Sequence, residues 1–430
     1  MSQSSPRPPR GAPFIVILLG ILLLAYYYLR AELITELPAS SFSRLALSVL
    51  LALPFLAVAG MPLVFLKRGR ANPEKLEAMA LVCYGAMGLL SMLFLGVLSR
   101  DILALAMGGA SLLAGYGFFS PRLFLLYGSA GTSITVSLSL VLYVVALLES
   151  RRTPRISRIE VPLSNLSPEL EGFKIAQISD LHVGPTIKRA YVERVVSSVN
   201  ALEPDVVALT GDIVDGPVDR LSADVAPLGG LSARSGIYYV TGNHEYYWGG
   251  PAWVDVLKKL GIIPLLNTHR VVERGKAQLV IAGVPDYTAH RMGQGERPSP
   301  EKALEGASPG AEVKVLLVHQ PKAAFAAARL GFHLQLSGHT HGGQFLPWTF
   351  VIYFFHTFVR GLNRLGDMWV YVSRGTGSWG PPLRLGASSE ITLLTLRRET
   401  PEIRARVCRR VALKPLPGHE ENGADFPKAG

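Results

Sequence analysis

The sequence predicts a multi-span α-helical membrane anchor followed by an α/β domain. Hydrophobic residues make up 49% of the 430 residues and charged residues only 17%, and the apolar excess lies in residues 1–150. From Glu160 onward, short β-rich runs alternate with helical stretches, which is typical of an α/β domain. All ten histidines lie in this second part. We therefore expect four regions: a transmembrane region at 1–150, a basic linker at 151–160, the α/β domain at 161–400 and a flexible tail at 401–430.

Charge and cysteine content narrow the class of protein. The formal net charge is +11, but the basic residues cluster beside the apolar runs and in the tail. They lack the interleaved aromatic residues of a protein that binds single-stranded nucleic acid. Membrane lipids are therefore the expected partner, and nucleic acid is not. Two cysteines, Cys83 and Cys408, provide neither a disulfide framework nor a cysteine-based zinc site.

The apolar part predicts four membrane spans. Short cytoplasmic loops carry the excess of Lys and Arg, and basic clusters lie before the first span, between the second and third, and after the last. These clusters share one side of the membrane only if the number of spans is even, which favours four spans and a cytoplasmic globular domain. Five spans with an external domain are the alternative, and residues 102–119 then form the extra span instead of extending the third. Because the spans carry no charged residues apart from Arg100 and Asp101, we interpret the region as an anchor rather than a transporter. The predicted spans are residues 14–29, 45–66, 78–98 and 133–148.

The second part predicts alternating strands and helices. Residues 173–178 form an apolar strand, and an apolar helical stripe from Tyr191 to Leu202 leads to the next strand at 206–209. Residues beyond Pro401 are rich in Pro, Gly and charge, so we expect disorder there. The other predicted strands are residues 237–240, 279–282, 313–318, 333–336, 369–372 and 391–396.

A carboxylate and an imidazole follow the first of these strands. Asp180 and His182 are two positions apart, so in an extended segment both side chains point to the same face and can bind one metal ion. The carboxyl end of a strand is also where α/β folds place their active sites. The alternative is that Asp180 caps the next helix and that His182 is incidental.

Similar polar groups follow four later strands. Imidazole, carboxylate and amide ligands without a thiolate suit Mn, Fe or Zn. Seven such groups, His244 excluded, are too many for one ion but suit two divalent ions that share a carboxylate. Two ions about 3.5–4 Å apart can clamp a phosphoryl group and activate a water. The later groups are Asp212, Asn243 with His244, His319, and His339 with His341.

These motifs, in this order and spacing, resemble the calcineurin-like metallophosphoesterase family and its membrane-associated bacterial branch, over about residues 156–396. The resemblance implies a two-sheet α/β sandwich and phosphoester hydrolysis by a two-metal mechanism with a bridging hydroxide. It implies that His244 is the general acid, oriented by Glu245. It also implies which groups hold the ions: Asp180, His182 and His341 one, Asn243, His319 and His339 the other, with Asp212 between them.

We therefore expect a multi-pass metallophosphoesterase of the bacterial inner membrane that acts on a phosphorylated small molecule or a lipid-linked substrate. A hydrolase of UDP-diacylglucosamine is one concrete lipid-linked case that the resemblance suggests. The alternatives are a phosphatase for proteins or nucleotides and a non-catalytic metal-binding membrane scaffold. The sequence gives no indication of the oligomeric state.

Several further residues carry hypotheses. Arg374 and Gln344 are candidates for substrate binding, although Arg374 could equally form a surface salt bridge. Asp215 and Asp286 are interpreted as solvated acidic residues rather than as supports of the site. Residues 345–359 are apolar and aromatic without Asp, Glu, Lys or Arg. They could be buried core, but Trp and Tyr mark membrane interfaces, so we expect this stretch to dip into the bilayer.

Overall fold

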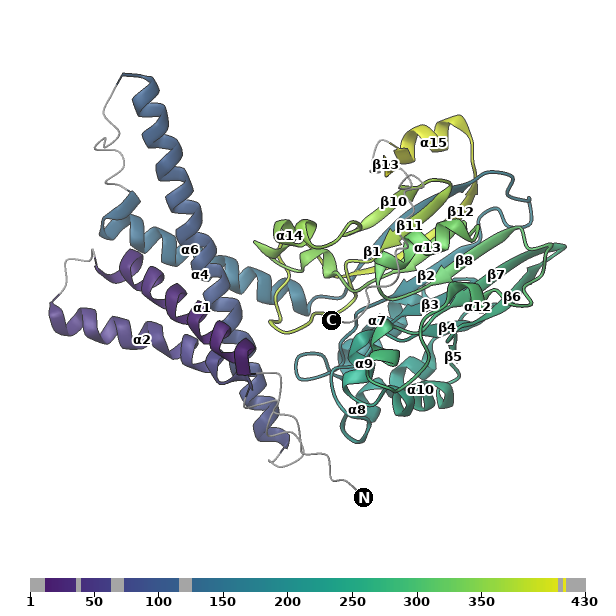
Figure 1. Ribbon diagram of the computed structural model, residues 1–430, viewed down its shortest axis with the longest axis horizontal. Helices are drawn as coiled ribbons and strands as arrows, with labels where there is room; N and C mark the ends of the chain where they lie inside the picture. The colour runs from purple at the N-terminus through teal and green to yellow at the C-terminus, as the bar shows by residue number, and fades with distance from the viewer. Residues whose placement is uncertain (1–11, 36–39, 63–72, 116–125, 409–412, 415–430) are drawn as a thin grey trace, which may run out of the picture. The chain divides into compact units, whose positions relative to one another are not determined.

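The computed structural model describes residues 12–35, 40–62, 73–115, 126–408 and 413–414. They form two compact units, drawn in Figure 1. The helical unit comprises Met1–Arg152 with two later segments, Gly343–Phe350 and Ser378–Ser388. The sandwich unit comprises Thr153–Gly342, Val351–Gly377 and Ser389–Gly430.

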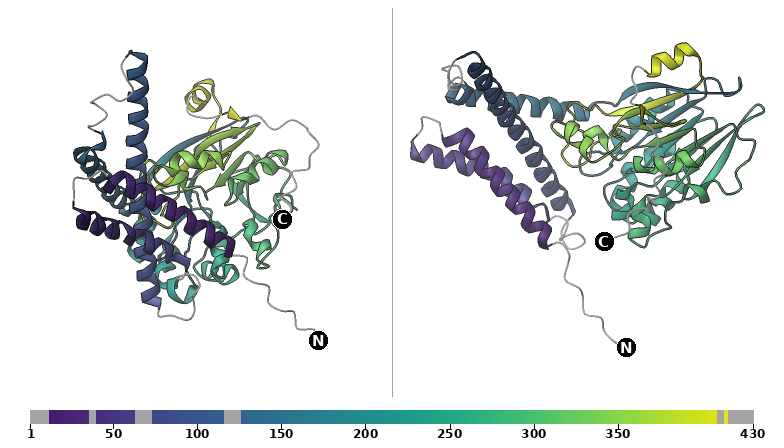
Figure 2. Two further views of the ribbon diagram at one scale, coloured as in Figure 1. Left: turned by 60° about the vertical axis from the view of Figure 1, so that its left-hand side comes forward. Right: turned by 45° about the horizontal axis from the view of Figure 1, so that its top comes forward.

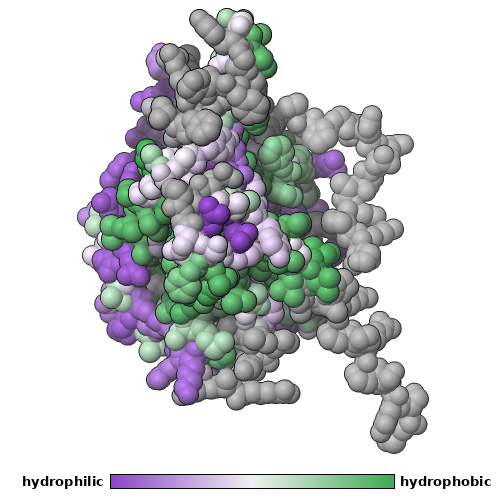
Figure 3. All heavy atoms as spheres, turned by 90° about the vertical axis from the view of Figure 1, so that its left-hand side faces the viewer, coloured by the Kyte–Doolittle hydropathy of each residue, from purple (hydrophilic) through white to green (hydrophobic). Residues whose placement is uncertain are grey.

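Among the described residues, four helices of the helical unit are long and apolar enough to cross a membrane, and that they are the four expected spans stays a prediction. The third runs without a break through residues 102–113, so that stretch extends it as expected; residues 116–119 lie outside the described residues. Large hydrophobic side chains are exposed along these helices, and they form green patches in Figure 3. The helices are α1 Ala12–Arg30, continued by the π-helical turn η1 Ala31–Thr35, α2 Ser41–Ala59, α4 Pro73–Leu113 and α6 Ser129–Arg151.

A buried polar cluster connects the end of the first span to α4. The Arg100 side chain is only 4% exposed; it pairs with the Glu32 carboxylate and lies 3.0 Å from Asp101 Oδ1. Tyr28 donates its hydroxyl to Asp101, and the Arg100 guanidinium lies 4.5 Å from the ring centre of Tyr127. Because a buried charge without partners is costly, these contacts explain how an apolar helix accommodates Arg100.

The sandwich unit contains two sheets, which confirms the predicted fold class (Figures 1 and 2). The six-stranded sheet has the order β1-β12-β2-β3-β4-β5, and the seven-stranded sheet has the order β13-β10-β11-β9-β8-β7-β6. The first comprises β1 Arg155–Leu163, β2 Lys174–Ile178, β3 Val206–Thr210, β4 Ile237–Val240, β5 Ile263–Pro264 and β12 Glu390–Arg398. The second comprises β6 Thr268–Arg274, β7 Ala277–Gly283, β8 Val313–Leu317, β9 Leu334–Ser337, β10 Gly361–Leu365, β11 Met368–Val372 and β13 Leu413–Lys414.

Apolar side chains fill three layers around these sheets. The middle layer lies between the sheets and includes Ile175 and Val206 from one and Leu279 and Trp369 from the other. Each of the two outer layers lies between one sheet and the helices that cover its outer face. Central strands such as β3 are buried at every position, so they are continuous apolar runs rather than alternating patterns. The helices are α7 Arg189–Asn200, α8 Val218–Val225, α9 Asn243–Tyr247, α10 Gly250–Lys259, α11 Tyr287–Arg291, α12 Pro300–Ala303, α13 Ala324–Arg329, α14 Trp348–Val351 and α15 Pro401–Cys408, with short 3-10 turns η2 Ala226–Gly230, η3 Pro321–Ala323, η4 His341–Gly343 and η5 Ile352–Phe354.

Two predicted boundaries are wrong. The basic linker at 151–160 is largely the edge strand β1, which pairs in parallel with β12. An edge strand leaves one side open, so it tolerates Arg155 and Arg158 as exposed residues. The tail begins with an ordered helix, α15, whose Val407 packs in the layer between the sheets, because this short amphipathic segment has an apolar side chain to bury. Residues 409–412 and 415–430 lie outside the described residues.

Candidate metal centre

The carboxyl ends of five strands from both sheets carry all of the predicted ligands. Gln177 ties the two sheets together at this edge, because its Nε2 donates to Thr210 Oγ1 at 2.8 Å and to the Ser337 carbonyl at 3.0 Å. The ligands are distributed as follows: Asp180 and His182 follow β2, Asp212 follows β3, Asn243 and His244 follow β4, His319 follows β8, and His339 and His341 follow β9.

The backbone at five of these residues is left-handed. The φ angles are +52° at Asp180, +51° at His182, +53° at Asp212, +74° at His339 and +52° at His341. Our argument from strand alternation was therefore wrong for Asp180 and His182, because β2 ends before them and the backbone at both is left-handed rather than extended. The same holds for His339 and His341 after β9. Non-glycine residues adopt this conformation at a cost of about 1–3 kcal/mol each, and such strain clusters at functional sites.

The first group of ligands consists of Asp180, His182 and His341. The Nε2 atoms of His182 and His341 lie 3.0 Å apart, and His341 Nε2 lies 3.4 Å from Asp180 Oδ1. Asp180 is held by Ser179 Oγ at 2.6 Å and by the backbone N–H of His339 at 2.9 Å. Burial raises the pKa of the Asp180 carboxyl, although the charge of His319 opposes this. The three donor groups converge on one point.

The second group joins His319, His339 and Asn243. His339 Nδ1 lies 3.2 Å from His319 Nε2 and 3.1 Å from Asn243 Oδ1. His319 Nδ1 lies 2.8 Å from the Thr210 carbonyl, which can only accept, so this contact assigns the proton to Nδ1 in the neutral ring and leaves the Nε2 lone pair for a cation. In both groups, hydrogen bonds to neighbouring residues therefore hold the candidate ligands in place before an ion binds.

Asp212 lies between the two groups. Its Oδ2 is 3.1 Å from His319 Nε2 and 3.8 Å from His182 Nε2. Burial alone would raise the pKa of Asp212, but the charges of His319 and His244 outweigh burial and hold it well below the usual range. A carboxylate that is ionised and reaches both groups is suited to bridge two cations.

The donor set fits divalent metal ions. In three overlapping sets the imidazole and carboxylate donor atoms lie within 4.8 Å of one another: Asp180 with His182 and His341, Asp212 with His319 and His339, and His182 with Asp212 and His244. Donors of these types suit Mn, Fe or Zn. Burial and the neighbouring charge of His319 lower the pKa of His339 to about 3, so this ring is neutral and ready to bind a cation. The pKa of His319 itself is different: burial opposes the charged form, but Asp212 raises the pKa well above its usual value. His319 and the Asp212 carboxylate thus stabilise each other's charged forms.

His244 stands beside the ligands and pairs with Asp215. The His244 Nδ1 atom forms a short contact with Asp215 Oδ1, while its Nε2 lies 3.9 Å from Asp212 Oδ2. Asp215 Oδ2 also lies 3.2 Å from His182 Nδ1. Burial lowers the pKa of His244, but Asp212 and Asp215 outweigh burial and raise it to about 9. The interpretation of Asp215 as a solvated residue is wrong, because it lies between two histidines of the cluster.

Contrary to our expectation, Glu245 does not orient His244. It is fully buried and accepts the backbone N–H groups of Gly242 at 2.7 Å, Asp212 at 3.1 Å and Ile213 at 2.6 Å. It therefore holds the loops after β3 and β4 together. Gly242 is required there by close approach, since a Cβ atom at this position would lie 2.1 Å from Asp212 Oδ1.

The two candidates for substrate binding have structural partners instead. Arg374 Nε donates to the buried Glu390 carboxylate at 2.9 Å and its Nη2 donates to Ser157 Oγ, which agrees with the salt-bridge alternative. Gln344 is buried, and its amide group bonds to the backbone of Trp379 and Pro381. As substrate contacts, both residues remain predictions.

Two residues at the centre were not predicted. His356 packs edge-on against His339 with ring centres 5.7 Å apart. Thr340 donates its hydroxyl to the Val359 carbonyl at 2.6 Å, which holds this segment against the ligand loop. Asp286 is also buried, caps α11 and accepts Gln320 Nε2 at 2.8 Å, so it is not solvated. Thr340 lies between His339 and His341 in the sequence, whereas His356 and Asp286 belong to no local motif and only the fold brings them here.

The aromatic stretch 345–359 is divided between core and surface. Its ends are core: Phe345, Phe358 and Val359 are at most 5% exposed. Its middle is not, since the exposed fraction reaches 69% at Phe350 and 86% at Phe354. The ends of the stretch are therefore buried core, as the alternative interpretation held, and for the exposed middle the dip into the bilayer stays a prediction.

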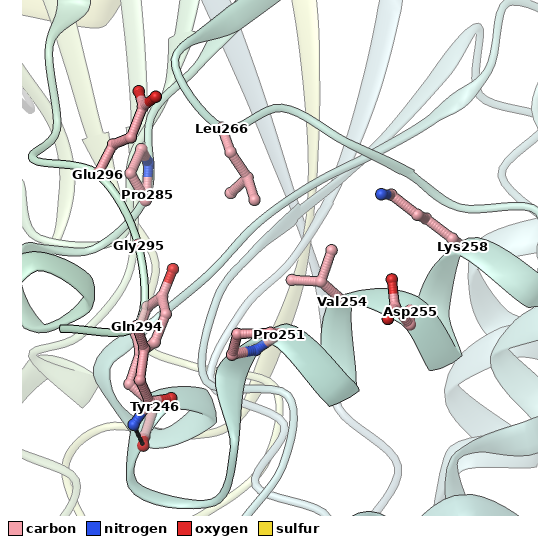
Figure 4. Close-up of a pocket in the computed structure, with 10 residues that line it drawn as sticks. All are labelled: Tyr246, Pro251, Val254, Asp255, Lys258, Leu266, Pro285, Gln294, Gly295 and Glu296. Carbon is pink, nitrogen blue, oxygen red and sulfur yellow. Dashed lines mark hydrogen bonds between the residues drawn. The ribbon is translucent and has the colours of Figure 1, made fainter. Parts of the chain in front are cut away.

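A separate pocket of about 390 Å³ lies beside α9 and α10 (Figure 4). Tyr246, two residues after His244, closes one end, and Gln294 donates from Nε2 to the Tyr246 carbonyl at 2.9 Å. Pro251 and Val254 line it with apolar surface, and Lys258 adds a charged group. None of the described residues that line this pocket is a predicted ligand, so it is distinct from the metal centre.

Comparisons with known proteins show what this chain is similar to. Residues 173–343 match the family model described as calcineurin-like phosphoesterase. A Bos taurus protein named transmembrane protein with metallophosphoesterase domain is 41% identical over 282 residues, 62% of this chain and 62% of that protein. The chain thus spans less than two thirds of that relative. An uncharacterized metallophosphoesterase of Campylobacter jejuni is 33% identical over 61% of this chain and 68% of its own length. A solved 5'-nucleotidase precursor from Thermus thermophilus is 17% identical, with a TM-score of 0.33, over 54% of this chain and 55% of that one.

Proposed function

The chain belongs to the calcineurin-like metallophosphoesterase family, and from this premise we propose that it is a membrane-anchored hydrolase of phosphoester or pyrophosphate bonds. Its proposed substrate is lipid-linked or membrane-proximal. The observation that carries the proposal is the position of Asp212 Oδ2, 3.1 Å from one histidine of the second ligand group and 3.8 Å from one of the first. A single carboxylate within reach of both groups is what a two-ion site requires.

We propose that two divalent ions occupy the centre. Asp180, His182 and His341 would hold one ion, and Asn243, His319 and His339 the other, with Asp212 shared. Bound there, the ions would supply a water activated at neutral pH and would neutralise charge on the phosphoryl group. The lowered pKa values of His339 and Asp212 favour the neutral ring and the ionised carboxylate that metal ligands need. His319, whose pKa is raised, would release its proton when an ion binds.

His244 is the proposed general acid. With a pKa of about 9 it carries a proton at neutral pH, and Asp215 holds its Nδ1 side, so Nε2 is the nitrogen that faces Asp212. Donation of that proton to the leaving oxygen would allow the bond to break without forming a free alkoxide. Asp215 acts through His244 and His182, so its role is to position them.

The membrane side of the proposal rests on the four apolar helices. Because their number is even, the basic residues before α1 and after α6 lie on the same side of the membrane, which favours a sandwich unit in the cytoplasm. The membrane would be the inner membrane of a bacterium. Residues 1–150 would be the anchor and residues 161–400 the catalytic domain, with β1 added to it. A substrate in or near the same membrane would then be the natural one.

The test is hydrolysis by the detergent-solubilised full chain loaded with Mn. We expect it to bind two equivalents of metal and to cleave a lipid phosphate or nucleotide-linked lipid faster than a water-soluble aryl phosphate. Asp212→Asn should abolish turnover and lose metal, whereas Asp367→Asn, on an exposed hairpin, should match the parent. A parent that binds two ions and cleaves none of these substrates would instead support a scaffold.

A further inference from the structure

Two loops from the second half of the chain pack within the helical unit. They are Gly343–Phe350, here called loop 1, and Ser378–Ser388, here called loop 2. Gln344 of loop 1 joins them, because its side chain donates to the carbonyls of Trp379 and Pro381 and accepts the Trp379 N–H, each at 2.9 Å. The Leu385 N–H also donates to the Gln344 carbonyl at 3.1 Å. The loops therefore form one paired element.

This paired element is fastened to the end of α6. The Arg384 N–H donates to the Ala146 carbonyl at 2.9 Å, and Ser150 Oγ donates to the Pro382 carbonyl at 2.6 Å. Phe345 of loop 1 and Leu383 of loop 2 share a buried cluster with Met92 of α4 and Ala146. The two loops thus lie on two of the four helices that are able to cross a membrane.

The position along α6 sets the depth of the loops. Ala146 precedes Arg151 by five residues, about 7.5 Å along the helix. Arg151 and Arg152 are exposed and end the helix, while Val145 and Leu148 before them are exposed and apolar. If α6 spans a bilayer, this change from apolar to basic side chains marks the boundary between acyl chains and headgroups. The loops are attached at that level.

The loops carry large aromatic side chains that are not buried. The exposed fractions are 49% for Trp348, 69% for Phe350 and 51% for Trp379. Trp is enriched at membrane interfaces because an apolar ring and a polar N–H can be satisfied there together. A phospholipid surface would account for three features of this region. It would cover the exposed apolar sides of α4 and α6, and it would provide a suitable environment for the Trp indoles. Its anionic headgroups would complement the charges of Arg151 and Arg152.

We propose that loops 1 and 2 form an interfacial anchor, in which Trp348, Phe350 and Trp379 insert among the headgroups of the membrane that α4 and α6 cross. The inference rests on the proposed membrane insertion of these helices. It goes beyond that insertion, since it assigns a lipid-binding surface to two segments that come from the second half of the chain. Gln344 is then the residue that keeps the two halves of the anchor together.

The experiment measures tryptophan fluorescence of the full chain in lipid nanodiscs. The chain has five tryptophans, and Trp253 and Trp369 are at most 1% exposed, so they provide an unquenched background. Nitroxide attached to the phospholipid headgroup should quench the parent more strongly than nitroxide at the end of the acyl chain. The double variant Trp348→Phe with Trp379→Phe should lose most of that quenching, while Trp248→Phe should retain it.

Equal quenching of the parent and the double variant would overturn the proposal. So would quenching that is absent in the parent while cross-linking shows that a second copy covers the loops. Resistance of the protein to extraction from membranes at alkaline pH reports on the helices separately. A parent that resists extraction but shows no headgroup quenching refutes only the anchor, whereas one that is extracted refutes the proposed membrane insertion itself.

Discussion

Replacement of Asp215 by Asn should shift the alkaline limb of the pH–rate profile. Asp215 contacts His244 Nδ1 and is, after Asp212, the main group that stabilises the His244 imidazolium. The acid must be protonated to act, so kcat falls as pH rises through the pKa of His244. Without the Asp215 charge that pKa is lower, and the fall in kcat begins at a lower pH.

The magnitude follows from the His244 pKa. Its rise from 6.5 to about 9 corresponds to about 3 kcal/mol of preference for the charged ring, at about 1.4 kcal/mol for each pKa unit. Loss of one of the two carboxylates that cause the rise should lower the pKa by about 1–2 units. Bound cations also lower it, so the limb of the parent lies at or below pH 9. Loss of a positioning partner should further reduce kcat about 10–100-fold at the optimum.

The assay is kcat against pH with Mn, for two phosphoesters that differ in their leaving group. An alkyl leaving group needs the proton of His244, whereas 4-nitrophenolate leaves readily without it. The Asp215→Asn variant should therefore lose more activity on the alkyl ester, and Asp367→Asn should match the parent on both. Metal content measured alongside shows whether the contact with His182 has been disturbed. An unshifted limb with equal losses on both esters at full metal content would refute the reasoning.

Three other changes test the centre. Gly242→Ala places a Cβ atom 2.1 Å from Asp212 Oδ1, so the purified variant should contain little metal by elemental analysis. Metal affinity should rise with pH, because a cation must displace a proton held by the raised pKa of His319. Calorimetry in buffers of different ionisation enthalpy counts that proton, and a pH-independent affinity would contradict the assignment. His356→Ala removes the ring packed against His339 and should weaken metal binding about tenfold, whereas His356→Phe, which keeps a ring, should bind nearly as the parent does.

Local patterns in the sequence were sufficient for much of the fold. Apolar runs predicted four membrane-length helices, and α7 and β4 appear where periodicity placed them. The prediction for residues 151–160 failed because it used local composition alone. The strand β1 carries Arg155 and Arg158 and therefore resembles a basic linker, and only its pairing with β12 makes it a strand.

The ligand motifs were visible in the sequence because each is a short group of polar residues after an apolar strand. Their convergence was expected at strand ends, but the geometry has another origin. The backbone at Asp180, His182, His339 and His341 is left-handed, so their side chains do not follow the alternation of an extended strand. Local backbone strain of this kind persists only where surrounding packing holds it, so residue spacing alone does not reveal it.

The sequence by itself determined the apolar helices, the types of the candidate ligands and their order along the chain. Only the tertiary structure decided which side chains support that chemistry. Asp215 and His356 belong to no local pattern that distinguishes them from solvated residues, and they act through His244 and His339 because distant segments meet there. Hydrophobic periodicity reports whether a segment is buried, whereas the partner of a polar side chain depends on pairings between segments far apart in the chain.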